Sequence, residues 1–485
     1  MANTNSILSK FPDYEVVIGI EVHVQLTTKS KIFCLCSNEV IKDPNVNICH
    51  ICTGHPGVLP VLNKKVVDYA IMAGLATNCS ITRLSEFDRK HYFYPDLPKG
   101  YQITQNDKPI CSEGYVNIRL EDLSKKQIRL MRIHMEEDAG KSIHATETES
   151  FVDLNRAGTP LLEMVTYPDL ASAYEAKAYL KALRSIVQYL HICSGNMEEG
   201  AFRADTNISV RKKGASKLGT KVELKNINSF KFIGDAIEYE IERQIGLLQE
   251  GQHIQQETRL WDTKEHITKP MRIKEEMADY RYFKEPDLPL IEINEEWINR
   301  IKSLIPELPE KKFDRFCTQK GLTPYEAEIL VEDLELANYF EEATKYTDSK
   351  NLINWILRDL LGYLKEEKIP LVSCKVTPNK LAQIVDLVEK DVINNQAAKQ
   401  IFEIVAKTGK DPLTVVKEEG LEQIGSTEEL EQVVLSIIKE NPAKVEQYKS
   451  GKDKLFGFFV GQAMQKTQGK GNPKILQELL KKHLS

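Results

Sequence analysis

The chain changes its hydrophobic periodicity once, near Pro289, and this change limits the folds it can adopt. Before that point, short runs of alternating apolar residues predict strands at 16–26, 127–134, 202–210 and 221–225. Helical patterns lie between them without strict alternation of strand and helix. After that point, apolar residues recur at helical spacing and prolines divide the chain into short helices. The sequence therefore predicts an α+β domain over 1–294, then helical domains over 295–410 and 411–485.

Composition narrows the class of protein. The chain has 485 residues, of which 41% are hydrophobic and 28% charged, as expected of a globular protein with two or three domains. No apolar run is long enough to cross a membrane, and residues 1–10 lack the pattern of a signal or transit peptide. The sequence therefore predicts a cytoplasmic protein that does not enter a membrane.

Charge is unevenly distributed along the chain. The formal net charge is −6, whereas residues 441–485 contain nine Lys and three Asp or Glu, a local charge of +6. A basic tail can bind a polyanion such as RNA. A solvated helical surface explains the same residues, and charge alone favours this simpler interpretation.

The first predicted strand carries polar residues in register. Its alternate positions are apolar, so Glu21, His23 and Gln25 share the opposite face. A later predicted strand repeats this pattern with Arg203 and Asp205. An exposed sheet face accepts such residues without any function, so this strand alone is equally compatible with a site and with a plain surface.

Acidic residues in apolar surroundings favour a site. Glu163 stands alone in the apolar run 160–165, and a buried carboxylate is costly unless a cation or basic group accompanies it. Residues 134–138 add a second acidic group at the end of a predicted strand. Carboxylates with Lys and Arg on one sheet face suit Mg²⁺-dependent nucleotide chemistry. The segment 140–142 reads GKS but lacks the first glycine of a P-loop, so ATP would bind on another scaffold.

Four of the nine cysteines form two close pairs: Cys34 with Cys36, and Cys49 with Cys52. Two such pairs that meet in space make a four-thiolate site, which favours Zn²⁺ and, with no position open to water, a structural role. His50 and His55 are substitute ligands in a less favoured arrangement. Four reduced cysteines in a loop are the simplest alternative.

Two loops interleave aromatic, basic and turn residues, one at 88–102 and one at 279–289. Such a loop can hold a nucleotide base or an RNA end by stacking and cation–π contact. A packed aromatic loop explains the composition equally well.

Several long motifs, in the same order along the chain, resemble the family of tRNA-dependent aspartyl/glutamyl amidotransferase B subunits. These motifs are GIEVHVQL at 19–26, YFYPDLPKGYQ at 92–102, HMEEDAGK at 134–141, VDLNRAGTPL at 152–161, MEEG at 197–200, ELKNINS at 223–229, GFFVGQ at 457–462 and GKGNP at 469–473. The resemblance runs from about Tyr14 to Leu480. It implies an N-terminal fold similar to the catalytic domain of glutamine synthetase and a tRNA-binding tail similar to the YqeY domain.

The resemblance also implies a set of site residues. Those expected to surround a Mg²⁺ ion are Glu21, His23, Glu137 and Glu163. Glu137 is further expected to border an ammonia tunnel, and Lys90 and Asp205 to be polar positions of the same catalytic pocket. Lys90, Arg89 and Arg203 are the candidates for contacting ATP phosphates. The four cysteines are a zinc site in some members of the family.

The implied activity is that of a ligase that forms C–N bonds with glutamine as amido donor. ATP would phosphorylate the side-chain carboxylate of Glu-tRNA(Gln) or Asp-tRNA(Asn). Ammonia released by an amidase, the A subunit, would then displace phosphate, and the small C subunit would complete the heterotrimer. Two alternatives stay open at this point: a non-catalytic tRNA-binding scaffold, and a ligase similar to glutamine synthetase that acts on a small acid without tRNA.

Overall fold

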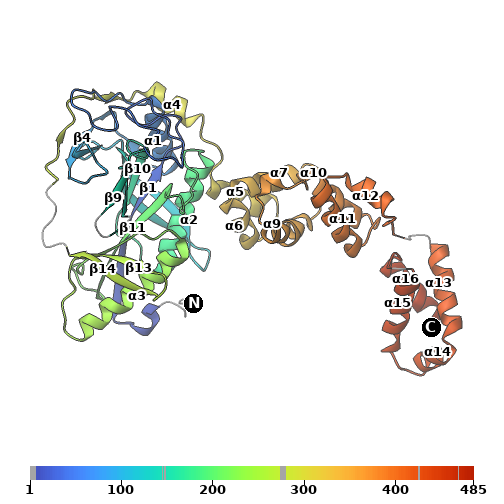
Figure 1. Cartoon of the computed structure of the whole chain (residues 1–485). Helices are drawn as coiled ribbons and strands as arrows, with labels where there is room; N and C mark the ends of the chain where they lie inside the picture. The colour runs from blue at the N-terminus through green and yellow to red at the C-terminus, as the bar shows by residue number, and fades with distance from the viewer. Residues whose placement is uncertain are drawn as a thin grey trace. The chain divides into compact units, whose positions relative to one another are not determined.

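The computed structural model describes residues 7–144, 146, 149–273, 280–423, 427–467 and 469–484. Asp279, the first residue of the second aromatic loop, lies outside them. Backbone contacts divide the chain into two compact units, Met1–Pro324 and Tyr325–Ser485 (Figure 1). All strands of the described residues belong to the first unit, and the described part of the second is helical. The mixed α and β architecture predicted from periodicity is confirmed.

A large sheet organises the first unit. In the described residues it has nine strands, antiparallel except for the parallel pair β12 and β13. Their spatial order is β14 (Ile267–Ile273), β13 (Glu257–Asp262), β12 (Val222–Lys225), β11 (Phe202–Lys212), β1 (Tyr14–Gln25), β10 (Pro160–Thr166), β7 (Lys125–Glu137), β6 (Cys111–Arg119) and β2 (Ser80–Ile81). The first strand of the chain is therefore central, with β10 and β11 as its neighbours.

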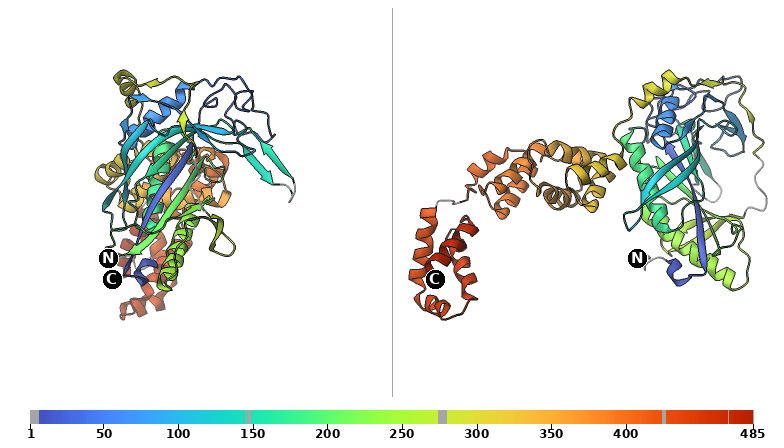
Figure 2. Two further views of the ribbon diagram at one scale, coloured as in Figure 1. Left: turned by 90° about the vertical axis from the view of Figure 1, so that its left-hand side faces the viewer. Right: turned by 180° about the vertical axis from the view of Figure 1, so that it is seen from behind.

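One face of this sheet carries the hydrophobic core. The helices α1 (Lys64–Ala76), α2 (Ala173–Tyr189) and α3 (Phe230–Gln249) pack on it (Figure 1, Figure 2). Ser172 precedes α2, and its hydroxyl caps the helix by accepting from the Glu175 amide at 3.1 Å. The alternate residues Ile18, Ile20 and Val22 of β1 face these helices and are fully buried. The other face, here called the polar face, carries the remaining half of each strand.

Smaller elements complete the first unit. A three-stranded sheet joins β15 (Phe283–Lys284), β4 (Asp88–His91) and β5 (Tyr101–Thr104), so it unites the two aromatic loops predicted separately. The remaining elements of this unit are η1 (Ile7–Lys10), β3 (Leu84–Ser85), β8 (Lys141–His144), β9 (Ser150–Asp153), β16 (Ile291–Glu292), α4 (Glu295–Lys302) and α5 (Pro309–Gln319).

The first unit extends beyond residue 294 because α4 and α5 pack against it. Trp297 and Arg300 of α4 both donate to Asp68 of α1, at 2.7 and 2.6 Å. In α5, the centroid of the Phe313 ring lies 3.4 Å from Cζ of the Arg119 guanidinium on β6. These contacts fix both helices to the sheet-containing unit.

The second unit consists of short helices, as the proline spacing predicted (Figure 2). They are α6 (Pro324–Glu332), which starts at the division between the units, α7 (Leu334–Ala343), α8 (Leu352–Asn354), the π-helix η2 (Trp355–Leu360), α9 (Leu361–Glu367), η3 (Leu371–Ser373), α10 (Pro378–Glu389), α11 (Asn395–Thr408), α12 (Pro412–Glu418), α13 (Thr427–Glu440), α14 (Pro442–Lys449), α15 (Leu455–Lys466) and α16 (Pro473–Leu484). Several begin with proline, which has no amide hydrogen to lose there. A separate core forms within 430–484. No helix in the described part of the chain combines the length and the apolar character needed to cross a membrane.

Candidate functional site

Cross-strand register gathers titratable residues on the polar face. His23 of β1 lies opposite Arg203 of β11 on one side and Glu163 of β10 on the other. Glu163 in turn lies opposite His134 of β7. Glu136 lies two residues after His134 and therefore on the same face. Four strands that are far apart in the sequence thus form one polar row.

The centre of this row is a compact group of two histidines and two carboxylates. His23 Nε2 lies 3.2 Å from Glu163 Oε2 and 3.9 Å from Glu136 Oε1. His134 Nε2 lies 3.5 Å from Glu136 Oε2 and 3.7 Å from Glu163 Oε2. His134 and Glu136 are buried, and His23 and Glu163 are largely so. We call these four residues the carboxylate–histidine group.

Electrostatics couple the members of this group. Burial opposes a charged imidazole, but the hydrogen bond to Glu163 and the charges of Glu163 and Glu136 outweigh it and raise the pKa of His23 to about 9. Burial also opposes the ionised form of Glu163, yet His134, His23 and Lys90 hold the pKa of Glu163 well below its usual range. Burial disfavours the Lys90 ammonium, and Glu136 and Glu163 nevertheless raise its pKa. The Glu163 carboxylate is thus held ionised beside the raised pKa values of His23 and Lys90.

The donor atoms of this group fit a divalent cation. One ligand atom each from His23, Glu136 and Glu163 lies within 4.8 Å of the others. Adjacent ligands of an octahedral Mg²⁺ ion, at about 2.1 Å from the metal, are about 3.0 Å apart, close to the 3.2 Å between His23 and Glu163. His134 Nδ1 and Arg132 Nε are buried without a hydrogen-bond partner among the described residues, so the group has unused polar capacity beside it.

A second acidic group continues along the same face. Glu21 of β1 lies opposite Asp205 of β11 and accepts from Asn207 Nδ2 at 3.2 Å. Lys225 Nζ contacts Asp205 at 2.7 Å and Glu223 at 3.2 Å. Burial, followed by the charges of Glu163, Asp205 and Glu223, raises the pKa of Glu21. The structure therefore brings Glu21 and Asp205 beside the carboxylate–histidine group, as the sequence suggested.

Glu137 does not join that group. By alternation it lies on the side of β7 opposite Glu136, where its carboxylate contacts the ammonium of Lys99 and accepts from the Ile103 amide at 3.0 Å. The reason is a β-bulge, because β7 shifts register against β10 at Met131. Alternation continued from Leu130 would have placed Glu137 on the polar face, and the bulge places Glu136 there instead.

The phosphate-binding candidates have different positions. Lys90 lies 4.7 Å from the Tyr280 ring and next to the charges of Glu136 and Glu163, so it belongs to the polar face. Arg89 points the other way along β4 and forms a two-pronged ion pair with Glu285, at 2.7 and 2.9 Å. Arg203 donates to Asp138 at 3.0 Å, and Gln25 donates to the same carboxylate.

Sequence reasoning missed three groups near this site. In the sequence Glu136 and His134 belong to an acidic stretch that singles out neither of them, and Arg132 stands in no motif. The signal was present, because Ile133 and Met135 are apolar out of phase with Ile128 and Leu130. Such a phase break within one strand indicates a bulge. Lys90 lies beside Tyr92 of the first aromatic loop and Tyr280 of the second, and no local pattern reveals that the two loops meet.

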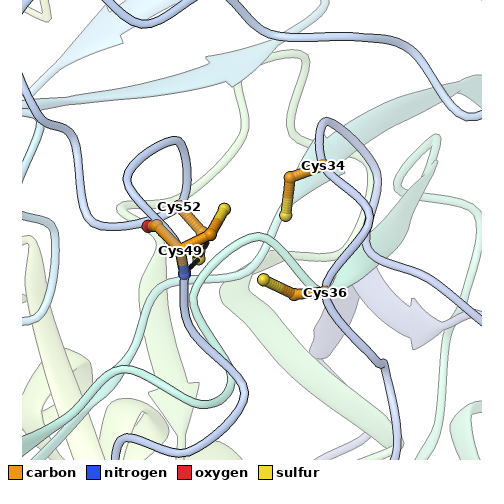
Figure 3. A group of neighbouring side chains, drawn as sticks. All are labelled: Cys34, Cys36, Cys49 and Cys52. Atoms are coloured by element: carbon orange, nitrogen blue, oxygen red, sulfur yellow. Dashed lines mark hydrogen bonds between the residues drawn. The ribbon is translucent and has the colours of Figure 1, made fainter.

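The four predicted cysteine ligands converge in one loop, residues 32–60, which we call the cysteine loop. Figure 3 shows Cys34 and Cys36 on one arm and Cys49 and Cys52 on the other, with the sulfurs turned toward a common centre. Tetrahedral ligands at about 2.3 Å from zinc lie about 3.8 Å apart, and Cys49 Sγ is 3.9 Å from Cys52 Sγ. His50 and His55 are exposed, and their rings contact each other edge to face instead.

One thiolate of this cluster is already favoured without metal. The hydrogen bond from Cys34 lowers the pKa of Cys52 to about 4; burial opposes this shift, and the Cys49 amide and Lys31 assist it. Burial raises the pKa of Cys36 to about 11. Four sulfurs within 4.8 Å of one another can hold a structural metal ion.

Comparison with known proteins covers nearly the whole chain. A family model described as "GatB/GatE catalytic domain" matches residues 16–299, and a second, described as "GatB domain", matches 338–484. The aspartyl/glutamyl-tRNA(Asn/Gln) amidotransferase B subunit of Thermodesulfovibrio yellowstonii is 50% identical over 472 residues, covering 97% of this chain and 99% of its own. The protein of the same name from Persephonella marina is 51% identical over 475 residues, covering 97% and 100%.

The polar row, the cysteine cluster and all of the large sheet except the first two residues of β1 fall within the matched ranges. The first matched range contains every residue of the carboxylate–histidine group, and the second covers most of the helical unit. The chain therefore belongs to the family of aspartyl/glutamyl-tRNA(Asn/Gln) amidotransferase B subunits.

Proposed function

We propose that this chain activates the side-chain carboxylate of Glu-tRNA(Gln), Asp-tRNA(Asn) or both. The carboxylate oxygen attacks the γ-phosphorus of ATP, an O–P bond forms as the bond to ADP breaks, and an acyl phosphate results. Ammonia then attacks the acyl carbon, loses a proton and expels phosphate, which leaves the amide. The observation that carries this proposal is the buried carboxylate–histidine group on the polar face.

His23, Glu136 and Glu163 are the residues that would hold a Mg²⁺ ion, with Glu21 beside them. When bound, Mg²⁺ supplies positive charge that neutralises the ATP phosphates during transfer. Lys90 is placed to stabilise the transferring phosphoryl group, since its ammonium lies on the same face. Asp205 and Lys225 form an ion pair that orients the neighbouring polar face. Arg203 keeps its role as a phosphate contact only if it leaves Asp138.

We extend the proposal to the fold, the partners and the metal of the cysteine loop. The sheet-containing unit is similar to the catalytic fold of glutamine synthetase, and the helices over 411–485 are a tRNA-binding tail similar to YqeY. The chain works in the cytoplasm with an amidase, the A subunit, which supplies ammonia from glutamine, and with the small C subunit. Glu137, paired with Lys99, borders the path of ammonia. The cysteine loop holds a structural Zn²⁺ ion.

The test is substitution of Glu163 in the reconstituted heterotrimer. Glu163→Gln keeps the side-chain volume but removes the charge that holds His23 and His134, so ATP-dependent amidation should fall at least about a hundredfold. Glutamine hydrolysis by the amidase should stay within about twofold. Glu15→Gln is the matched control, because Glu15 lies on the polar face of the neighbouring strand β1 but pairs with Arg211 at 2.5 Å, away from the group.

Two results would contradict the proposal. Undiminished amidation by the Glu163→Gln heterotrimer would remove the carboxylate–histidine group from the reaction. Weaker tRNA binding by this variant, with the tRNA that still binds amidated at an unchanged rate, would favour a scaffold role for this face.

A further inference from the structure

A small cavity lies between the cysteine loop and the end of β7. Cys34 and Cys52 line it on one side, and Lys99 and Glu137 on the other. Its volume is about 20 Å³, room for little more than one water molecule. The cysteine cluster therefore forms a wall of the pocket that holds Glu137.

The turn at residues 49–54, which carries Cys49 and Cys52, packs directly against Lys99. Its backbone is closed by the Thr53 amide donating to Cys49 at 3.0 Å and the Gly54 amide donating to Ile51 at 3.1 Å. Gly54 has a φ of +70°, and a methyl group there would come within 2.6 Å of Lys99 Cγ and 2.9 Å of the Lys99 amide nitrogen. Only glycine permits this approach. Because Cys49 and Cys52 flank the turn, their ligation fixes where Gly54 stands.

The packing of Lys99 against Gly54 in turn holds the Lys99 side chain beside Glu137. Its ammonium contacts the Glu137 carboxylate, which is 3% exposed and also accepts from the Ile103 amide at 3.0 Å. The Lys99 side chain has Gly54 behind it and the ring of Tyr101 at 5.5 Å from its nitrogen. A shift of the turn removes one wall of this packing and frees Lys99 from Glu137.

A second contact ties the cluster to the neighbouring backbone. Lys31 is fully buried, and its ammonium lies 3.7 Å from Cys52 Sγ and donates to the Asn47 carbonyl at 2.7 Å. Next to it, the Ile32 amide donates to Gly158, whose own amide donates to Asp138, both at 3.0 Å. Four thiolates around a divalent ion carry a net charge of −2, which a buried ammonium partly offsets.

We propose that metal binding by the four cysteines positions Lys99 against Glu137, so that the cysteine loop sets the geometry of the pocket at the end of β7. The cluster is then a positioning element of the amidation site as well as a local structural staple. This inference rests on the proposed function for its activity readout alone, since the positioning itself is measurable without any reaction.

The first measurement is hydrogen exchange on the complete heterotrimer, with zinc content determined by elemental mass spectrometry. Removal of the metal by a chelator, or by Cys36→Ser, should accelerate exchange at least tenfold in peptides covering 97–104, where the Ile103 amide donates to Glu137. Hydrogen exchange in peptides from α2 should be unchanged, which would show that the fold is intact. Unchanged exchange over 97–104 after metal removal would overturn the inference.

The second measurement compares two glycines of the same loop. Gly54 and Gly57 both have positive φ, +70° and +83°, so alanine is strained at either position, but only Gly54 has Lys99 within reach. With zinc retained, Gly54→Ala should accelerate exchange over 97–104 and lower amidation at least tenfold, while Gly57→Ala should change both less than twofold. Equal effects of the two variants would overturn the inference.

The two proposals fail separately. If Gly54→Ala does not retain zinc, the chelator comparison on the unaltered heterotrimer decides the question. If Glu163→Gln leaves amidation intact, the proposed function fails, and the exchange measurements still test the coupling between the metal and Glu137.

Discussion

Binding of Mg²⁺ to the nucleotide-free protein should release close to one proton per ion at pH 7.5. His23 must be neutral to ligate a metal, but Glu163, Glu136 and Asp205 raise its pKa to about 9 in the absence of the ion, against the opposing effect of burial. A group of this pKa is about 97% protonated at pH 7.5, whereas one at the ordinary value near 6.5 is about 9% protonated. The expected release therefore differs about tenfold between the two cases.

The same shift predicts how affinity and stability depend on pH. Because a proton must leave, Mg²⁺ affinity should rise about tenfold per pH unit between pH 7 and 9 and level off above pH 9. In the metal-free protein, a raised pKa stabilises the fold below the unfolded-state value. His23 thus contributes up to about 3 kcal/mol below pH 6.5, and this contribution is lost as the pH rises through about 9.

Calorimetric titration in two buffers with different ionisation enthalpies measures the number of protons released. His23→Gln is the control, since it should bind Mg²⁺ more weakly and release almost no proton through this group. A release below about 0.2 proton per ion in the unaltered protein at pH 7.5 would refute the charge balance derived for the carboxylate–histidine group.

Two further comparisons, each between a pair of variants, test the arrangement of charges. In the same titration, Glu136→Gln should weaken Mg²⁺ binding at least about tenfold and Glu137→Gln less than about twofold. The reason is that only Glu136 faces His23. Equal losses of Mg²⁺ affinity in the two variants would argue against the bulge in β7. Arg89→Leu leaves the buried Glu285 carboxylate unpaired and should lower the free energy of unfolding of the sheet-containing unit by about 3–5 kcal/mol, whereas removal of the exposed Arg129 pair should lower it far less. Denaturant unfolding monitored by a probe in that unit checks both expectations, and similar losses would contradict the assigned burial.

The sequence by itself determined the change from mixed strand and helix to helix near Pro289, the four strands β1, β7, β11 and β12, and much of the candidate chemistry. Alternation of apolar residues predicted β1 within two residues of its observed start, because side-chain direction along a strand is a local property. Proline placement predicted the short helices of the second unit, since proline is tolerated only in the first turn of a helix. The spacing of the four cysteines predicted their convergence, because both pairs lie within one short segment of the chain.

Tertiary structure alone decided which carboxylate faces which partner. Glu136 rather than Glu137 reaches His23, because the bulge at Met131 shifts β7 against β10 and reverses the faces beyond it. Arg89 is committed to Glu285, which lies 196 residues away in the sequence. Cross-strand register and long-range ion pairs depend on hydrogen bonds and packing between distant segments, and these energies are absent from any local pattern.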